Sequence, residues 1–126
     1  MKKWMVLPVL ALTLTACGDD APELDQAAVD RGKRIAENCT ACHALSGTAN
    51  MVGPTLSGVI GRKAGQVRNY DYSEGMKSSG ITWTPDEITR FIMDPIGVVP
   101  GTKMALSPLT KEEASDVSTY LQSISR

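Results

Sequence analysis

Apolar residues recur three and four positions apart in three stretches of the chain, which is the spacing of one helix face. The stretches cover residues 25–38, 84–94 and 110–126. Their apolar positions are, in order, Val29, Ile35, Ala36 and Cys39; Ile88, Phe91 and Ile92; and Ala114, Val117, Tyr120, Leu121 and Ile124. No stretch alternates apolar and polar residues as a half-buried strand does, so the pattern predicts an all-α domain with three main helices.

Capping residues support the two later helices. Thr84 and Thr110 each precede a helix, and Glu87 and Glu113 follow them three residues later, so a capping box is predicted at both starts. Pro95 disfavours a helical residue before it, and therefore predicts that the middle helix ends there.

Gly32 lies inside the first helix, where it costs about 1 kcal/mol relative to alanine. A residue without a side chain allows two backbones to approach closely. We therefore expect Gly32 to mark a close crossing with another helix.

Residues 44–83 are rich in Gly, Ser, Asn and Thr and show little periodicity. One short helix fits inside this stretch, with Ser73 as its cap and Gly80 just past its end. So long an irregular stretch is unusual in a compact domain unless its loops wrap something. The pattern therefore predicts a large internal cofactor surrounded by loops.

The start of the chain has a different pattern. Two lysines precede the apolar run WMVLPVLALTL, which is too short to span a bilayer and is typical of a signal peptide. We expect residues 1–16 to be removed; an uncleaved anchor is the alternative. The sequence LTAC, ending at Cys17, resembles the lipobox of bacterial lipoproteins, where the cysteine becomes the acylated N-terminus. This resemblance implies a lipid anchor at Cys17, a polar tether over residues 17–24 and a domain over residues 25–126; an ordinary cut site beside a stray cysteine is the other interpretation.

The charge balance is that of an ordinary soluble protein of one domain. The chain has 13 Lys and Arg against 14 Asp and Glu, a net charge of −1. Loss of Lys2 and Lys3 with the leader leaves 11 bases against the same 14 acids, or −3. A negative domain disfavours binding to the phosphates of nucleic acid. We expect a monomer that binds no nucleic acid.

The sequence CTACH brings two thiols together with the only histidine of the chain. A tetrahedral zinc site needs four ligands, and no second histidine exists to complete one. A thioredoxin-like redox pair expects a strand before it, whereas a helix precedes this pair. The motif instead predicts one covalent haem c, with Cys39 and Cys42 bound to its vinyl groups and His43 bound to its iron.

The sixth iron ligand must come from another residue type, and methionine is the usual partner of histidine. The candidates beyond the leader are Met51, Met76, Met93 and Met104. Met51 follows the histidine closely, and Met76 and Met93 lie in predicted helices. Met104 lies in a loop turned by a Pro-Gly pair, from which it can reach the open haem face. We predict Met104 as the ligand; any of the four can alternatively fill a gap in the core.

Two longer segments, GRKAGQVRNYDYSEGMKSSGITW and DPIGVVPGTKMAL, resemble the class I cytochromes c of mitochondria and bacteria. The likeness runs from Gly32 to the C-terminus and implies the class I cytochrome c fold: three main helices and a short one, with long loops around a covalent haem. It implies that Pro54 offers its carbonyl oxygen to the second nitrogen of His43, and that Gly32 crosses Tyr120 and Leu121. It also implies contacts with the haem propionates, made by Arg62, Tyr72, Trp83 and Thr102.

The chain departs from mitochondrial forms around the haem edge. Phe91 stands in place of a tyrosine, and Leu106 replaces an aromatic residue. Ile96 and Gly97 occupy positions where lysines occur in mitochondrial forms. Electrons are expected to pass through an apolar edge near Leu106 and residues 98–99.

The resemblance implies a one-electron carrier rather than an enzyme: a membrane-anchored monohaem cytochrome c on the periplasmic side of a bacterial membrane. Its implied partners in a respiratory or photosynthetic chain are membrane-bound redox proteins, namely quinol–cytochrome c oxidoreductase, a terminal oxidase or a reaction centre. The alternatives are a haem peroxidase or ligand-binding haem protein, which would need an open sixth position, and a fixed electron-transfer subunit of a larger complex.

Overall fold

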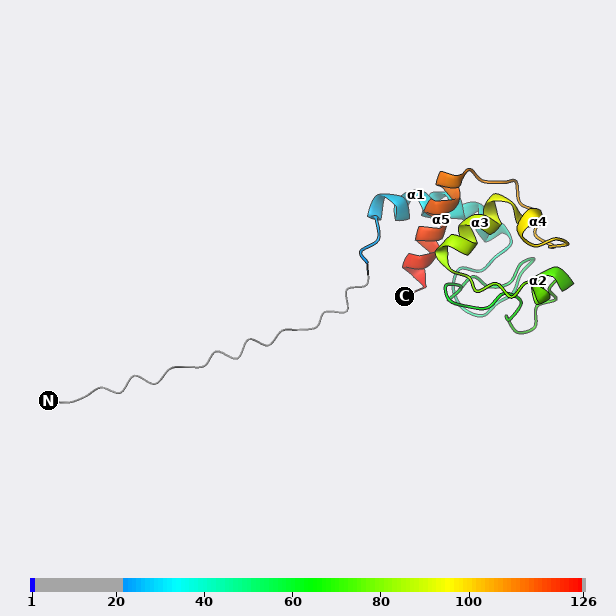
Figure 1. The fold of residues 1–126 in the computed structure, drawn as a ribbon, viewed down its shortest axis with the longest axis horizontal. Helices are drawn as coiled ribbons and strands as arrows, with labels where there is room; N and C mark the ends of the chain where they lie inside the picture. Colours follow the sequence, from blue (N-terminus) through cyan, green and yellow to red (C-terminus); the bar gives the residue numbers. More distant parts are fainter. Residues whose placement is uncertain (2–21, 126) are drawn as a thin grey trace.

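A computed structural model of the chain describes residues 1 and 22–125 (Figure 1). Cys17, the rest of the predicted leader and most of the predicted tether lie outside the described residues. In the described part, none of the helices has the length and apolar character that crossing a bilayer requires.

Three helices of nine residues or more and three shorter turns make up the regular structure of residues 22–125. They are α1 (Gln26–Ala36), η1 (Glu37–Ala41), α2 (Glu74–Ser78), α3 (Pro85–Met93), α4 (Pro95–Val98) and α5 (Lys111–Ile124). The described residues contain no strand and only one isolated bridge, between Lys63 and Thr82. The predicted all-α class is therefore confirmed, and Figure 1 shows α1, α3 and α5 together, with α2, α4 and the loops beside them.

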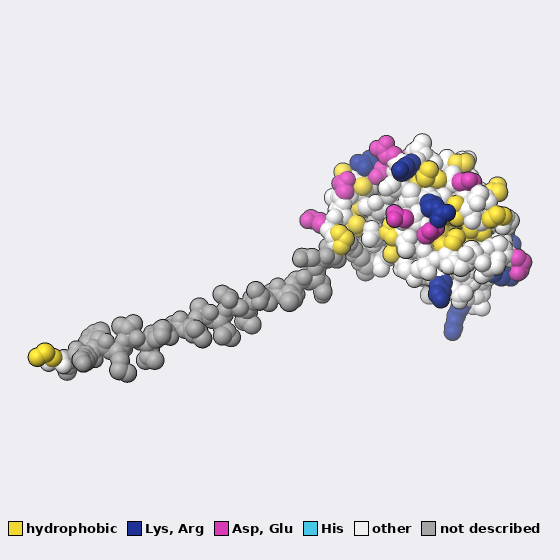
Figure 2. Space-filling model, in the orientation of Figure 1, with side chains coloured by type: hydrophobic (Ala, Val, Ile, Leu, Met, Phe, Trp, Pro, Cys, Tyr) yellow, Lys and Arg dark blue, Asp and Glu magenta, His cyan; other side chains and the backbone are white. Residues whose placement is uncertain are grey.

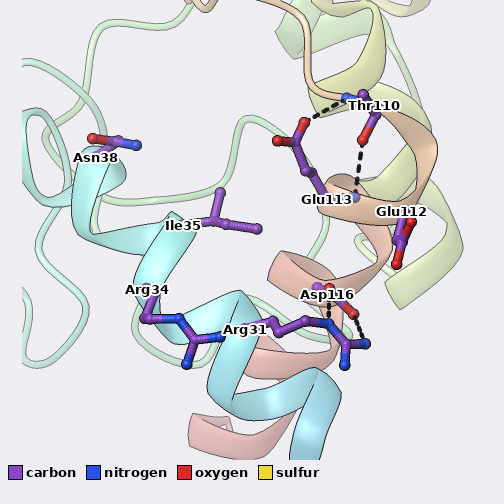
Figure 3. A pocket seen from close by; sticks show the side chains of 8 residues that line it. All are labelled: Arg31, Arg34, Ile35, Asn38, Thr110, Glu112, Glu113 and Asp116. Carbon is purple, nitrogen blue, oxygen red and sulfur yellow. Dashed lines mark hydrogen bonds and ion pairs between the residues drawn. The ribbon is translucent and has the colours of Figure 1, made fainter.

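The first and last helices cross at Gly32. A Cβ on Gly32 would overlap the backbone carbonyl of Asp116 and lie 2.9 Å from Cβ of Tyr120, so only glycine fits there. Beside it, Arg31 donates two hydrogen bonds to the Asp116 carboxylate, of 2.7 and 2.9 Å (Figure 3). The predicted close crossing is confirmed, but Leu121 packs in the core and the backbone of Asp116 takes its place at the glycine.

The predicted caps are confirmed at α5 and only in part at α3. Thr110 and Glu113 form the capping box, each side chain accepting from the backbone N–H of the other (Figure 3). Thr84 accepts from the N–H of Glu87 at 3.2 Å, but the Glu87 carboxylate binds Arg90 instead of returning to Thr84. An arginine one turn away on the same helix competes for the carboxylate, so the predicted second box is wrong.

The short helix α4 is an addition to the predicted fold. Pro95 ends α3 as expected and also takes the first position of α4, where its missing N–H is not needed. The Asp94 carboxylate caps the new helix by accepting from the N–H of Gly97 at 3.0 Å. The prediction of three main helices and a single short one is therefore incomplete.

One hydrophobic core joins the helices to the loops. Its buried members are Val59, Ala64, Met76, Trp83, Ile88, Phe91, Ile92, Val99, Ala114, Val117 and Leu121. The loop residues that pack against this core remain partly exposed, among them Leu45, Leu56, Tyr72, Met104 and Leu106. The core thus takes side chains from helices and loops alike, while several apolar loop side chains remain partly exposed.

Candidate functional site

The motif CTACH sits on the turn that follows α1. The N–H groups of Cys42 and His43 both donate to the carbonyl oxygen of Cys39, at 3.1 and 2.9 Å, so the two cysteines lie one helical turn apart. Both thiols are free and half-buried. Burial, reinforced by the neighbouring Cys42, raises the pKa of Cys39, which favours a neutral thiol over a metal-binding thiolate.

The ring of His43 is held from two directions. Nδ1 lies 2.7 Å from the carbonyl oxygen of Pro54, a distance at which an Nδ1–H donates a hydrogen bond. The backbone of Gly53 packs against the ring so closely that a Cβ on Gly53 would overlap it. With Nδ1 engaged, Nε2 is the nitrogen left to bind a metal ion.

The four methionine candidates lie in different surroundings. Met76 is buried in α2, Met93 is half-buried in α3 and Met51 is 49% exposed. Met104 is half-buried on the loop that joins α4 to α5, where its N–H donates to the Thr102 hydroxyl at 3.3 Å. The same loop packs on α2 so tightly that a Cβ on Gly75 would overlap the Pro100 carbonyl.

Arg62 carries a half-buried positive charge without a carboxylate partner among the described residues. Its guanidinium donates to the carbonyl oxygens of Thr55 and Ser57, at 2.7 and 3.0 Å. Burial lowers the pKa of Arg62, and Tyr72 lies near enough to oppose that shift electrostatically. The Tyr72 hydroxyl accepts from the N–H of Val67 at 3.3 Å, and burial raises its pKa. The structure therefore brings two of the predicted propionate residues together.

Trp83 and Thr102, the other two predicted propionate residues, have different surroundings. Trp83 is 9% exposed and packs on Phe91 with ring centroids 5.2 Å apart. Thr102 lies two residues before Met104, and its hydroxyl faces the Met104 backbone. Phe91 is thus a core aromatic residue in contact with the indole.

These residues fit a haem better than a bare metal ion. In the described part of the chain, no group of three or more His, Cys, Asp or Glu could hold a metal ion alone, which removes the zinc interpretation there. Two free thiols, one oriented imidazole and a guanidinium without a carboxylate partner in the described residues match the needs of a covalent, propionate-bearing porphyrin. The partly exposed apolar side chains of the loops supply a surface against which such a ring would pack.

Comparison with known proteins decides the family, because the Cytochrome c family model matches residues 29–125. The chain belongs to the cytochrome c family. A cytochrome c homolog of Bradyrhizobium diazoefficiens is 43% identical over 105 residues, which cover 81% of this chain but only 57% of that relative. Cytochrome c2 of Agrobacterium tumefaciens is 43% identical over 98 residues, covering 74% of this chain and 88% of the relative.

A solved structure gives the same result for the fold. Cytochrome cH from Methylobacterium extorquens aligns with a TM-score of 0.70 and 36% identity, over 75% of this chain and 97% of its own. The fold is therefore that of a class I cytochrome c with one covalent haem c. As a member of this family the chain is a monohaem electron-transfer protein and not an enzyme.

The surface expected around the haem edge differs in one respect from its prediction. Val99 is 1% exposed and belongs to the core, whereas Val98 and Leu106 are half-buried and Ile96 is 70% exposed. Residue 99 is therefore no part of an exposed edge. Acidic and basic side chains are interspersed with apolar ones on the face shown in Figure 2, where neither sign of charge dominates.

Some important residues carry little signal in the sequence. Gly53 supports the His43 ring and Asp116 binds Arg31 across 85 residues, but neither belongs to a periodic pattern. A hollow of about 550 Å³ beside the Arg31–Asp116 pair (Figure 3) and another of about 790 Å³ between α2 and α3 are lined by other residues than the cysteines and His43. The contacts that hold His43 come from the loop backbone at Gly53 and Pro54.

Proposed function

We propose that the chain is a lipid-anchored, periplasmic carrier that moves single electrons between membrane-bound redox proteins. The observation that carries the proposal is the fixed imidazole of His43, with Nδ1 on the Pro54 carbonyl and Nε2 free, directly after two free thiols. The lipobox-like sequence at Cys17 supports the anchor. The implied partners are quinol–cytochrome c oxidoreductase, a terminal oxidase or a reaction centre.

The chain's own residues supply attachment and orientation. Cys39 and Cys42 would hold the haem by thioether bonds, and His43 and Met104 would bind its iron. The bound group would supply the one-electron chemistry of iron between its ferrous and ferric states. Because the Pro54 carbonyl and the Gly53 backbone already fix the His43 ring, little of the protein needs to move when the charge changes.

Arg62 and Tyr72 would receive a propionate. A guanidinium bound only to neutral carbonyl oxygens retains a full positive charge for an anion. Burying a carboxylate without such a partner is costly, so this contact would also fix how deeply the ring enters the loops. Thr102, on the loop of Met104, and Trp83 are the remaining proposed propionate residues.

The ligand assignment is tested by replacing the methionines in the mature, haem-loaded protein. Met104→Ala should abolish the weak far-red sulfur-to-iron absorption band of the oxidised form, whereas Met76→Ala should keep it. Loss of the band in Met76→Ala alone would move the ligand to Met76. Carbon monoxide binding by the reduced wild type at neutral pH would indicate an open position and favour a ligand-binding role.

The anchor is tested by fractionation. Wild type should pellet with membranes and require detergent for release, because several acyl chains hold a protein where one binds only marginally. Cys17→Ser should be soluble or remain uncleaved. Release of wild type by high salt alone would show that ionic contacts, and not lipid, hold the protein.

We propose that partners dock on the face around the Met104 loop, Ile96 and Val98, through a mostly apolar contact. Ile96 is exposed, and Lys103, the base next to Met104, is paired with Asp71 at 2.6 Å. A negative domain with little free positive charge at this face should show electron-transfer rates that depend weakly on ionic strength. Val98→Asp should slow the reaction clearly. A steep fall with salt and an unchanged Val98→Asp rate would show that charge elsewhere governs docking.

A further inference from the structure

We propose that Asn50 is a positioning residue that acts on His43 through the peptide between Pro54 and Thr55, and thereby lowers the reduction potential of the protein. The inference rests on the proposed function in one respect, namely that His43 binds the iron. The carbonyl of this peptide is the partner of the His43 ring, and the N–H on its other side is bound to the Asn50 side chain.

Three hydrogen bonds run in series from the imidazole. His43 Nδ1 lies 2.7 Å from the carbonyl oxygen of Pro54. The N–H of Thr55 donates to Oδ1 of Asn50 at 3.2 Å, and Nδ2 of Asn50 donates to the carbonyl oxygen of Arg68 at 2.9 Å. The orientation of the Asn50 amide follows from its partners, because the reverse orientation would bring its NH2 against an N–H and its oxygen against a carbonyl. Each bond in the series therefore has its donor on the side nearer to His43.

Hydrogen bonds arranged in this order strengthen one another. An amide that donates through its N–H carries more negative charge on its oxygen, and becomes a stronger acceptor. Asn50 thus makes the Pro54 carbonyl a stronger acceptor for the Nδ1–H of His43, and a stronger bond there makes the imidazole a more basic ligand. A more basic ligand stabilises ferric iron relative to ferrous iron, which lowers the reduction potential. Thr55 is only 6% exposed, and shielding from water makes such bonds electrostatically stronger.

The position of the peptide is fixed by other bonds than those of Asn50. The N–H of Gly53 donates to the Cys42 carbonyl at 2.7 Å, and the N–H of Leu56 donates to the Ala44 carbonyl at 2.8 Å. These two bonds flank the peptide and hold its segment beside the histidine from both sides. The distinctive contribution of Asn50 is therefore to polarise the peptide and not to hold it in place.

Tyr70 supplies the matched control. Its hydroxyl donates to the Val52 carbonyl at 2.7 Å, so it joins the same two loop segments, residues 50–52 and 68–70, as Asn50 does. That bond ends two residues before the carbonyl that faces the histidine. Tyr70→Phe should therefore loosen the connection between the loops, by the loss of one hydrogen bond, without changing the acceptor strength of the Pro54 carbonyl.

The test uses the mature, haem-loaded protein in wild type, Asn50→Ala, Asn50→Asp and Tyr70→Phe. Reduction potentials are measured by titration against redox mediators, and thermal unfolding reports the stability of each variant. His43 is the only histidine of the chain, so isotope-labelled histidine gives one set of ring signals in nuclear magnetic resonance. The chemical shift of its Nδ1–H in the diamagnetic ferrous form reports the strength of the hydrogen bond to Pro54.

In Asn50→Ala we expect the equilibrium constant for reduction by a mediator to rise about threefold, or roughly 28 mV at 59 mV per tenfold for one electron. The Nδ1–H signal should move upfield, because the bond to the Pro54 carbonyl weakens. Asn50→Asp offers Thr55 a stronger acceptor, so the potential should fall and the signal should move downfield. Tyr70→Phe should lose stability but keep the potential and the signal of wild type.

A potential that moves in the same direction in both Asn50 variants would overturn the proposal, since loosening of the loop explains that result. A shift in Tyr70→Phe as large as that in Asn50→Ala, or an unchanged Nδ1–H signal in both Asn50 variants, would also overturn it. If Asn50→Ala does not retain haem, the comparison of Asn50→Asp with Tyr70→Phe decides by the same two readouts. Absence of paramagnetic shifts from the His43 ring of oxidised wild type would instead refute the proposed function, because the histidine would then not bind the iron.

Discussion

The two halves of this domain are held together in different ways. In the helical half, α1 and α3 each pack their apolar faces on α5, and Ala36, Ala114 and Val117 are at most 1% exposed. In the loop half, residues 44–72 contain no helix, and their apolar side chains are mostly half-covered. The helical half is a packed protein core, whereas the loop half is built around something that the chain does not supply.

Side-chain hydrogen bonds to backbone carbonyls take over the role of helices in the loop half. The buried Thr55 hydroxyl donates to the Gly47 carbonyl at 2.9 Å, Arg62 binds two carbonyls and Tyr70 binds one. Such bonds fix the path of the chain but bury little apolar area, which is the main source of folding free energy. The difference teaches that loop geometry here can be specific without being stable alone.

Removal of both thiols should show this most strongly. In Cys39→Ala/Cys42→Ala the haem cannot be attached, so we expect the loss of cooperative folding. Amides of residues 44–72 should lose protection from hydrogen exchange, because the apolar surface that the loops wrap is missing. Acid-acetone extraction of wild type should leave the colour on the polypeptide. A cooperative unfolding transition in the thiol-free chain would contradict the view of the loop half as dependent on its cofactor.

The helical half is challenged by Gly32→Val. The new side chain would overlap the Asp116 backbone, which cannot move without separating α1 from α5. We expect a loss of about 3 kcal/mol in the free energy of unfolding, measured by denaturant titration of the holoprotein. Ala27→Val, on the exposed side of α1, is the control and should change stability by less than about 0.5 kcal/mol. Equal losses of unfolding free energy in the two variants would mean that the helix crossing contributes no stability beyond the helix propensities of the substituted residues.

A smaller effect is expected from Arg62→Leu in the loop half. The variant loses the hydrogen bonds to Thr55 and Ser57, which should cost about 1–2 kcal/mol of unfolding free energy. If Arg62 also neutralises a propionate, the reduction potential should fall. Removal of a nearby positive charge stabilises the more positive ferric haem relative to the ferrous haem. Arg62→Lys should recover the potential in part but not the paired carbonyl bonds. An unchanged potential would remove Arg62 from the proposed propionate contact.

The smallest effect concerns the ion pair between Lys103 and Asp71, which links the Met104 loop to the loop half. Hydrogen bonding to Lys103 lowers the pKa of Asp71, so the pair contributes stability above the ordinary aspartate pKa of about 3.9 and loses it as pH falls through the lowered value. Both groups are exposed, so the contribution is slight. Near neutral pH, the far-red bands of wild type and Asp71→Asn should differ a little. In strong acid, where the ion pair is lost, the two bands should become alike. A difference that grows in acid would reverse the assigned sign.

The sequence predicts the helical half better than the loop half, and the reason is physical. The stripe of Ile88, Phe91 and Ile92 repeats with the helical period, so burial of all three follows from spacing alone. Pro95 begins α4, and the Glu87 carboxylate binds Arg90 instead of the Thr84 backbone. Both outcomes depend on which local partners compete for a group, and a periodic pattern contains no information about that competition. The CTACH motif predicts the haem chemistry, but only the folded chain reveals Gly53 against His43, because that contact joins two irregular segments.

The crossing of α1 with α5 also sets an order of events during synthesis. Arg31 and Asp116 are 85 residues apart, and α5 ends at Ile124, so the crossing cannot close until almost the whole chain has been made. Cys39 and Cys42 directly follow α1 and emerge early. A contact between distant segments also forms slowly, because a long loop must close before any contact compensates for the lost entropy. The segment that carries the two thiols is therefore made well before the last helix can close this crossing.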